Sequence, residues 1–204
     1  MKKDYSNKFN LMVIDPPWSY TEFGTASAEK HYGLMSQEDI NQLPIRSVMH
    51  PKNGMILVWA TGPKLHYAIE SIQKWGLHYR GVAFVWTKTR KSDGAIINGQ
   101  GVPPTFTKPS TEFVLLATVK KSGRPLKLKK FNSPQVIPAP RGAHSKKPEC
   151  VMEVIRETLD DWDSLKKIEV FGREAREGWT VVGNQSPDTF GEDVAVSLSR
   201  LGQK

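Results

Sequence analysis

Four consecutive residues, Asp15, Pro16, Pro17 and Trp18, are the first candidates for chemistry in this chain. They follow residues 11–14, a continuous apolar run with two β-branched members, which predicts a buried strand. A proline has no N–H and a fixed φ, so the two prolines must turn the chain out of the sheet. Asp15 is therefore expected at the carboxyl end of a strand, where open α/β sheets bind their ligands.

This cluster suits a flat substrate that carries an exocyclic amine. The Asp15 carboxylate and the Pro16 carbonyl could accept the two N–H hydrogens, while Trp18 walls or stacks against the ring. The alternative is a Pro-Pro turn with a surface Asp cap and a core Trp, which is the better interpretation of Asp-Pro alone because short motifs often match by chance. The full four-residue string directly after a buried strand favours the amine site.

Size and composition predict one soluble, cytoplasmic domain over residues 1–204. With 38% hydrophobic and 25% charged residues, a chain of 204 residues can bury a full core. The single cysteine, Cys150, excludes an internal disulfide and fits a reducing compartment. We expect no secretion signal and no membrane-spanning run.

Charge is distributed unevenly along the chain. The net charge is +8, yet residues 1–148 hold 22 Lys/Arg against 9 Asp/Glu, whereas residues 149–204 hold 7 against 12. Residues 120–130 contain six bases and no acid. This segregation predicts a basic face for a polyanion, with Lys127, Lys129 and Lys130 as candidate phosphate contacts, although a solubility feature or a subunit contact would also explain the segment.

Alternating strands and helices predict a three-layer α/β sandwich around a mostly parallel sheet. Strands are expected over residues 11–14, 55–61, 82–86, 112–119, 136–137, 167–171 and 179–183. Helices are expected from a capping-box-like start at Ser36, over residues 65–75, and from Pro148 to Leu159. Residues 87–110 are rich in Lys, Gly and Pro and predict a long mobile loop.

A cofactor pocket in such a sheet needs a strand followed by a small residue. The chain has no Gly-rich dinucleotide triplet and no Walker loop, which leaves residues 169–173, ending in Phe171, Gly172 and Arg173, as the candidate. No further His or Cys stands at ligand spacing from His31 or His144, so no metal site is assigned.

The Asp-Pro-Pro-Trp string resembles the catalytic motif of adenine-N6 methyltransferases, in particular the family named for the catalytic subunit of the eukaryotic mRNA adenine methyltransferase, which has small bacterial and phage members. The resemblance covers roughly residues 10–186 in a consistent order. It implies a Rossmann-like fold of the permuted (β-class) type, because the catalytic strand precedes the cofactor strand. It also implies S-adenosyl-L-methionine as cofactor and the cytoplasm of a bacterium or a phage-infected cell.

The resemblance also implies roles for individual residues. Residues 171–173 match the family's reduced cofactor motif and residues 184–185 its adenosine-contacting pair, so Arg173 and Gln185 would bind ribose hydroxyls and Asn184 the adenine or ribose. Residues 29–33 and 144–148 resemble two active-site loops. The residues implied to contact substrate or cofactor there and nearby are Tyr32, Glu112, Ser145, Lys147 and Asp15.

Several of these residues could instead have purely structural roles. Tyr32 could close a hydrophobic staple, Glu112 could pair with a nearby Lys, and Lys147 could be a solvated base. The chain also departs from the family where a polar pair follows the Arg, because Ala175 and Arg176 stand there. Lys147 is the expected substitute for contacts to the carboxylate of the cofactor.

The function expected from these residues is methyl transfer to the N6 amine of adenine in DNA. The same reaction on RNA and a catalytically inactive, nucleic-acid-binding subunit of a methyltransferase pair are the alternatives. The expected partners are nucleic acid, most of all DNA, and a second copy of the chain or a partner subunit. No membrane partner is expected.

Overall fold

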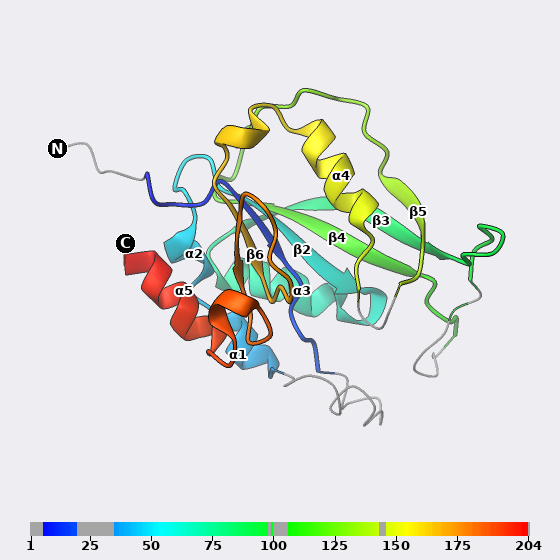
Figure 1. The fold of residues 1–204 in the computed structure, drawn as a ribbon, viewed down its shortest axis with the longest axis horizontal. Coiled ribbons are helices and arrows are strands. Elements are labelled where there is room, and N and C mark those ends of the chain that lie inside the picture. Colours follow the sequence, from blue (N-terminus) through cyan, green and yellow to red (C-terminus); the bar gives the residue numbers. More distant parts are fainter. Residues whose placement is uncertain (1–5, 20–34, 98, 100–105, 143–145, 204) are drawn as a thin grey trace.

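The computed structural model describes residues 6–19, 35–97, 99, 106–142 and 146–203 (Figure 1). A seven-stranded sheet forms the centre, in the order β5-β3-β4-β2-β1-β6-β7. The strands are β1 Leu11–Ile14, β2 Met55–Thr61, β3 His78–Thr89, β4 Thr111–Thr118, β5 Val136–Pro140, β6 Lys167–Val170 and β7 Trp179–Val182. All seven predicted strands are therefore present.

Only β4 runs against the other strands. It pairs antiparallel with β2 and β3, while the β1–β2, β1–β6, β6–β7 and β3–β5 pairs are parallel. The start of β4 therefore lies at the same edge of the sheet as the carboxyl ends of the parallel strands. Glu112, which pairs with Thr61 of β2 and Trp86 of β3, is held at that edge.

Helices cover both faces of the sheet, which gives the predicted three layers (Figure 1). The α-helices are α1 Gln37–Asn41, α2 Ile45–Val48, α3 Leu65–Lys74, α4 Glu149–Thr158 and α5 Val194–Gln203, and 3-10 turns span Gly62–Lys64, Trp162–Ser164 and Pro187–Thr189. Apolar side chains of α4 join Leu11 and Val13 in one buried cluster. Those of the other four helices join Met12 and Ile14 in a second cluster on the opposite face. Successive side chains of β1 thus point to opposite layers, as a strand requires.

The expected starts and ends of the helices are confirmed where local chemistry sets them. The Ser36 hydroxyl accepts a hydrogen bond from the Asp39 backbone N–H at 3.1 Å, which caps α1. Gly76, at φ +70°, follows the end of α3 in the left-handed conformation that glycine adopts most easily. The sequence reasoning did not assign α2 and α5, although Val194 and Leu198 of α5 stand at helical spacing and are buried.

Two strands extend beyond their predicted ends. β3 continues to Thr89, so residues 87–89 of the expected loop are strand, and the turn that follows folds back with an Ile97 N–H to Lys88 carbonyl bond of 2.9 Å. β5 was expected to stop at Pro138 but runs to Pro140. It is an edge strand, and only such a strand tolerates prolines, because one of its sides needs no N–H donor.

No helix in the described part of the chain combines the length and the apolar composition that a bilayer crossing requires.

Candidate active site

Ionisable side chains from four segments meet at the carboxyl edge of the sheet, on the face that α4 covers. Asp15 follows Leu11 and Val13 at strand periodicity, so its side chain points to the α4 layer. Lys88 lies two residues beyond Trp86 on the same face of β3, and Trp86 pairs with Glu112 of β4. Lys147 stands just before the start of α4.

These four side chains form a continuous chain of ion pairs. Lys147 Nζ lies 2.9 Å from Asp15 Oδ2 and 3.2 Å from Glu112 Oε2. The other oxygen of Glu112, Oε1, lies 2.7 Å from Lys88 Nζ. The exposed fraction of the side chains is 32% for Asp15, 22% for Lys147, 12% for Glu112 and 24% for Lys88, so water screens the pairs only in part.

Burial and the neighbouring charges shift the pKa values of Lys147, Glu112 and Asp15 in opposing directions. Burial by itself would lower the pKa of Lys147, but the carboxylates of Asp15 and Glu112 outweigh it and the pKa is strongly raised. Burial would raise the pKa of Glu112, yet Lys147 and Lys88 together hold it below its ordinary value. Burial dominates at Asp15, whose pKa is raised although Lys147 opposes the shift. Two ammonium groups, Lys147 and Lys88, lie at ion-pair distance from Glu112, whereas Asp15 has one such partner and is also repelled by Glu112.

The turn after Asp15 uses the backbone of the two prolines. The Pro16 carbonyl accepts the Trp18 N–H at 2.8 Å, and the Pro17 carbonyl accepts the Met35 N–H at 3.4 Å. A carbonyl oxygen has two lone pairs, so the Pro16 oxygen retains one acceptor position.

The structure gives Trp18 a packing role. Its side chain is only 6% exposed and lies in the apolar cluster opposite α4, and its indole N–H donates to the Trp59 carbonyl at 3.2 Å. This burial fits the core-Trp alternative. The role of Trp18 as a wall or stacking surface for a substrate ring stays a prediction.

The predicted cofactor segment lies directly beside Asp15. Ile14 pairs with Val170, and the Asp15 N–H points to the Val170 carbonyl at 3.4 Å. Phe171 then adopts φ +66°, a conformation that is uncommon for a residue other than glycine and that often marks functional sites. This turn places Arg173, which is exposed, near enough to Asp15 to act on its charge.

Two glycines allow the ends of β6 and β7 to pack this closely. A Cβ on Gly172 would lie 2.3 Å from Val181 Cγ1, and a Cβ on Gly183 would lie 2.3 Å from the Gly172 carbonyl oxygen. Asn184 and Gln185 follow directly, exposed and half-buried respectively. Small residues, a turned backbone and polar side chains at the strand ends fit an adenosine-bearing cofactor.

Comparison with known proteins agrees with this arrangement. The profile of the MT-A70 family matches residues 9–185. The chain belongs to the MT-A70 family. It is therefore an S-adenosylmethionine-dependent methyltransferase of the adenine-N6 type with a Rossmann-like fold.

Two individual relatives resemble most of this chain, and a third resembles less than half of it. The Type II methyltransferase M.MunI from a Mycoplasma species is 28% identical over 200 residues, which cover 89% of this chain and 79% of M.MunI. The human N(6)-adenine-specific methyltransferase METTL4 is 24% identical over 89% of this chain, which spans 38% of METTL4. The non-catalytic N6-adenosine-methyltransferase subunit MTB of Arabidopsis thaliana is 26% identical over 45% of this chain and 12% of MTB.

The departure of this MT-A70 chain at residues 175 and 176 has a structural explanation. Arg176 Nη1 lies 2.5 Å from Glu149 Oε1, and Arg176 Nε lies 3.0 Å from Glu169 Oε2. Arg176 thus ties the first turn of α4 to β6 behind the site. Lys147 remains the predicted contact for the carboxylate of the cofactor.

Two predicted substrate contacts, Tyr32 and Ser145, lie outside the described residues. The lysines of the basic segment are described, and they lie away from the site. The segment after β4 leaves from the opposite edge of the sheet, where the N–H groups of Lys129 and Lys130 bond to the carbonyl of Thr158 at the far end of α4. The three lysines of that segment therefore do not approach Asp15.

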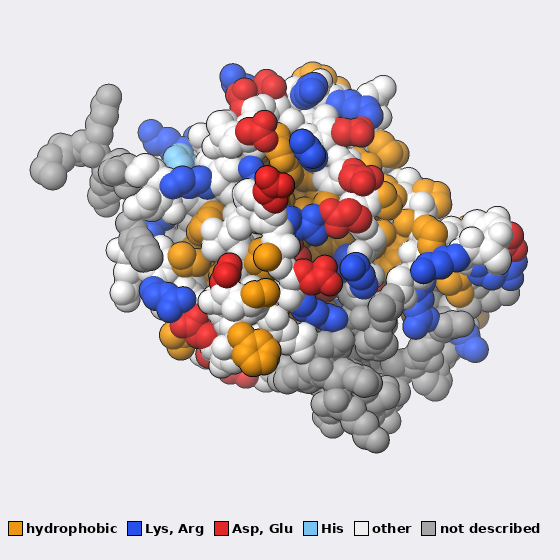
Figure 2. Space-filling model, in the orientation of Figure 1, with side chains coloured by type: hydrophobic (Ala, Val, Ile, Leu, Met, Phe, Trp, Pro, Cys, Tyr) orange, Lys and Arg blue, Asp and Glu red, His pale blue; other side chains and the backbone are white. Residues whose placement is uncertain are grey.

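Acidic residues also compensate part of that basic segment. Lys127 Nζ lies 3.8 Å from Asp161 Oδ2, and Lys130 Nζ lies 3.1 Å from Glu157 Oε2. Figure 2 accordingly shows basic and acidic side chains mixed around α4, without a field of one sign. A phosphate contact by Lys127, Lys129 or Lys130 stays a prediction, and its place is remote from the reacting base.

Sequence reasoning missed Lys88, because it lies in a Lys-rich stretch that was expected to be loop. Its spacing of two from Trp86 was the available signal.

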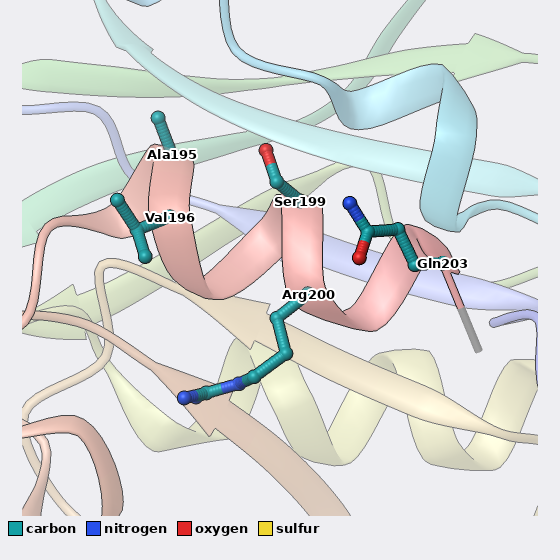
Figure 3. A pocket seen from close by; sticks show the side chains of 5 residues that line it. All are labelled: Ala195, Val196, Ser199, Arg200 and Gln203. Carbon is teal, nitrogen blue, oxygen red and sulfur yellow. The ribbon is translucent and has the colours of Figure 1, made fainter.

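The described residues offer neither a metal site nor a pocket beside Asp15. Among the described residues, no group of three or more His, Cys, Asp or Glu side chains could hold a metal ion. A shallow hollow of about 380 Å³ is lined by Ala195, Val196, Ser199, Arg200 and Gln203 of α5 (Figure 3). It lies on the helix layer opposite α4, away from the Asp15 side chain.

Proposed function

We propose that this MT-A70 protein methylates the N6 amine of adenine in DNA. The observation that carries the proposal is the ion-paired cluster of Asp15, Lys147 and Glu112 at the carboxyl edge, directly beside the turn after β6. The similarity to the Type II methyltransferase M.MunI, which covers 79% of M.MunI, supports DNA as the polymer.

The residues at the edge can hold the amine in a reactive orientation. Lys147 Nζ pairs with Asp15 Oδ2, and the second oxygen of this partly exposed carboxylate can accept one amine hydrogen. The second lone pair of the Pro16 carbonyl can accept the other. Two acceptors at fixed positions favour a pyramidal nitrogen whose lone pair points away from them, toward the strand end that holds Gly172 and Arg173.

When bound, S-adenosylmethionine supplies the electrophilic methyl group. The protein then contributes orientation and electrostatic preorganisation. No base has to remove a proton beforehand, because the methylated nitrogen loses its proton easily. In a duplex the target base must leave the stack. Trp18 and Tyr32 are the aromatic candidates to receive it.

The experiment is incubation with labelled S-adenosylmethionine and separate pools of double-stranded DNA, single-stranded DNA and RNA. We expect label in N6-methyladenine of a DNA pool, and none with Asp15→Ala. Label in RNA alone would show that RNA and not DNA is the substrate. The absence of label from every pool would refute the proposal.

The similarity to MTB favours a second candidate, a non-catalytic subunit. The intact contacts among Asp15, Lys147 and Glu112 oppose it, because a subunit without chemistry needs no such arrangement. Calorimetry separates the two: the enzyme binds S-adenosylmethionine at micromolar concentrations, whereas a degenerate subunit does not. Sedimentation with and without cofactor tests whether the chain forms a homodimer or awaits a partner subunit.

The basic segment provides an independent test of nucleic-acid binding. Changing Lys127, Lys129 and Lys130 to Gln should flatten the slope of log affinity against log salt by roughly one unit per lost phosphate contact. Asp161 already pairs with Lys127, and Glu157 with Lys130. We therefore expect a change in the slope of about one unit in total. Lys74→Gln on α3 is the control, and an unchanged slope in the triple variant would remove the segment from the binding surface.

A further inference from the structure

Lys88 is the ionisable member of the site that no sequence motif predicts. Its ammonium lies 2.7 Å from Glu112 Oε1. This is the shortest of the three ion-pair distances that link Lys88, Glu112, Lys147 and Asp15. It also lies 5.1 Å from the centre of the Trp86 ring, within the range of a cation–π contact.

The backbone holds Lys88 in place on both sides. Its N–H donates to the Ser110 carbonyl at 2.9 Å, and its carbonyl accepts the Ile97 N–H at 2.9 Å. A lysine side chain is flexible, but one that starts from a fixed strand position and is only 24% exposed has few ways to leave Glu112. Lys88 thus provides a stable anchor for one end of the cluster.

The charges explain what this anchor does. Asp15 and Glu112 are two carboxylates, and Lys147 bridges them. If Lys88 were absent, Oε1 of Glu112 would lose its donor, and Glu112 would compete for Lys147 with both oxygens. Lys147 would then be drawn away from Asp15, whose orientation depends on that contact.

We propose that Lys88 is a positioning residue for methyl transfer: by holding Glu112, it keeps Lys147 in the bridging position that orients Asp15. The proposal rests on the function proposed above and assigns Lys88 no contact with the reacting amine. The groups that face Glu112 in this argument are Lys88 from β3, Lys147 from the start of the α4 segment, and Asp15 beyond it.

The kinetic test compares Lys88→Met with wild type on the DNA pool that wild type methylates. We expect kcat to fall more than tenfold while KM for S-adenosylmethionine stays within about twofold. Lys88→Arg, which can still pair with the carboxylate, should recover at least fivefold over Lys88→Met. Lys91→Met is the matched control, since Lys91 is an exposed lysine in the turn after β3, and it should match wild type.

The rival explanation is that Lys88 binds a phosphate of the DNA. In that case Lys88→Met would raise KM for DNA and flatten its salt dependence, while kcat would stay at the wild-type value. That result, or a Lys88→Met enzyme with unchanged kcat, overturns the proposal. Lys88→Gln provides the same comparison if the Met variant unfolds.

A second measurement needs no activity. In protein labelled at glutamate carboxyl carbons, the NMR titration of Glu112, assigned with Glu112→Gln, should move to higher pH in Lys88→Met, because an opposite charge at ion-pair distance is lost. An unchanged midpoint overturns the proposal. If wild type transfers no methyl group to any pool, the proposed function fails, and this titration still decides whether Lys88 holds Glu112.

Discussion

Replacement of Asp15 by Asn separates catalysis from folding in this site. The amide keeps the shape of the side chain and one acceptor oxygen, but it removes the charge that lies 2.9 Å from Lys147 Nζ. The amine nitrogen becomes positive as the new N–C bond forms, and a carboxylate about 4 Å away at an effective dielectric constant near 20 would stabilise it by roughly 4 kcal/mol. Since 32% of the Asp15 side chain is exposed, we reduce this to about 3 kcal/mol, a magnitude typical of one oriented catalytic group.

The expected result is a fall in kcat of roughly 150-fold, because each 1.36 kcal/mol of barrier corresponds to about a factor of ten. Affinity for S-adenosylmethionine should stay within a few-fold. The assay is single-turnover transfer of a labelled methyl group to DNA, with cofactor binding measured separately by calorimetry. An Asp15→Asn enzyme within threefold of the wild-type rate would refute the assignment of the carboxylate.

Folding stability should change little in the same variant. Burial raises the pKa of Asp15, so its contribution to stability is present below the unfolded pKa and is lost as pH rises through the folded pKa. At neutral pH the Asn variant no longer carries the free-energy cost of burying the Asp15 charge, but Lys147 loses one of its two carboxylate partners. These effects oppose each other, and we expect a Tm within a few degrees of wild type by calorimetry.

Four other variants test neighbouring parts of the site. Trp18→Ala should lower the free energy of unfolding by about 3–5 kcal/mol in urea titrations, as expected for an aromatic core residue, whereas a stable variant with impaired transfer would support a stacking role. Arg173→Ala and Gln185→Ala should raise the Kd for S-adenosylmethionine and for the demethylated product in calorimetry with Tm unchanged, and wild-type affinity in both would move the cofactor site elsewhere. Gly183→Ala should cost roughly 1–3 kcal/mol of stability, because its Cβ would meet a backbone oxygen at 2.3 Å, and an unchanged Tm would show that the two strand ends can separate freely.

Most of the sheet could be predicted from sequence because β1, β2, β6 and β7 are short apolar runs that Pro or Gly follows within two residues. The ends of β3 and β5 were the exceptions. The prolines of β5 indicated an end to that strand, and only the three-dimensional order of the strands shows that no described strand pairs with its outer side. Local pattern alone therefore gives the wrong boundary wherever the position of a strand in the sheet decides what is tolerated.

The site could be predicted only in part, because ion pairs join residues that are distant in sequence. Glu112 was expected either near the target base or paired with a lysine. The register of β4 holds it at the site edge, where it pairs with Lys88 and Lys147 at once. Lys147 could have been a solvated base, but its partners hold it at 22% exposure. The acids that face the basic segment, Glu157 and Asp161, follow it by about thirty residues, so no count within the segment could reveal them.

The prolines of β5 have a consequence for how this protein associates with others. The Arg141 N–H donates to the Thr89 carbonyl of β3. Backbone N–H groups alternate in direction along a strand, so those of Ala139 and Ile137 also point to β3. The backbone positions of Pro138 and Pro140 therefore face outward. The outer side of β5 thus lacks donors at two of its three outward positions. A further strand from another chain cannot complete its ladder there, which protects this edge from aggregation and excludes a dimer built by continuing the sheet across β5.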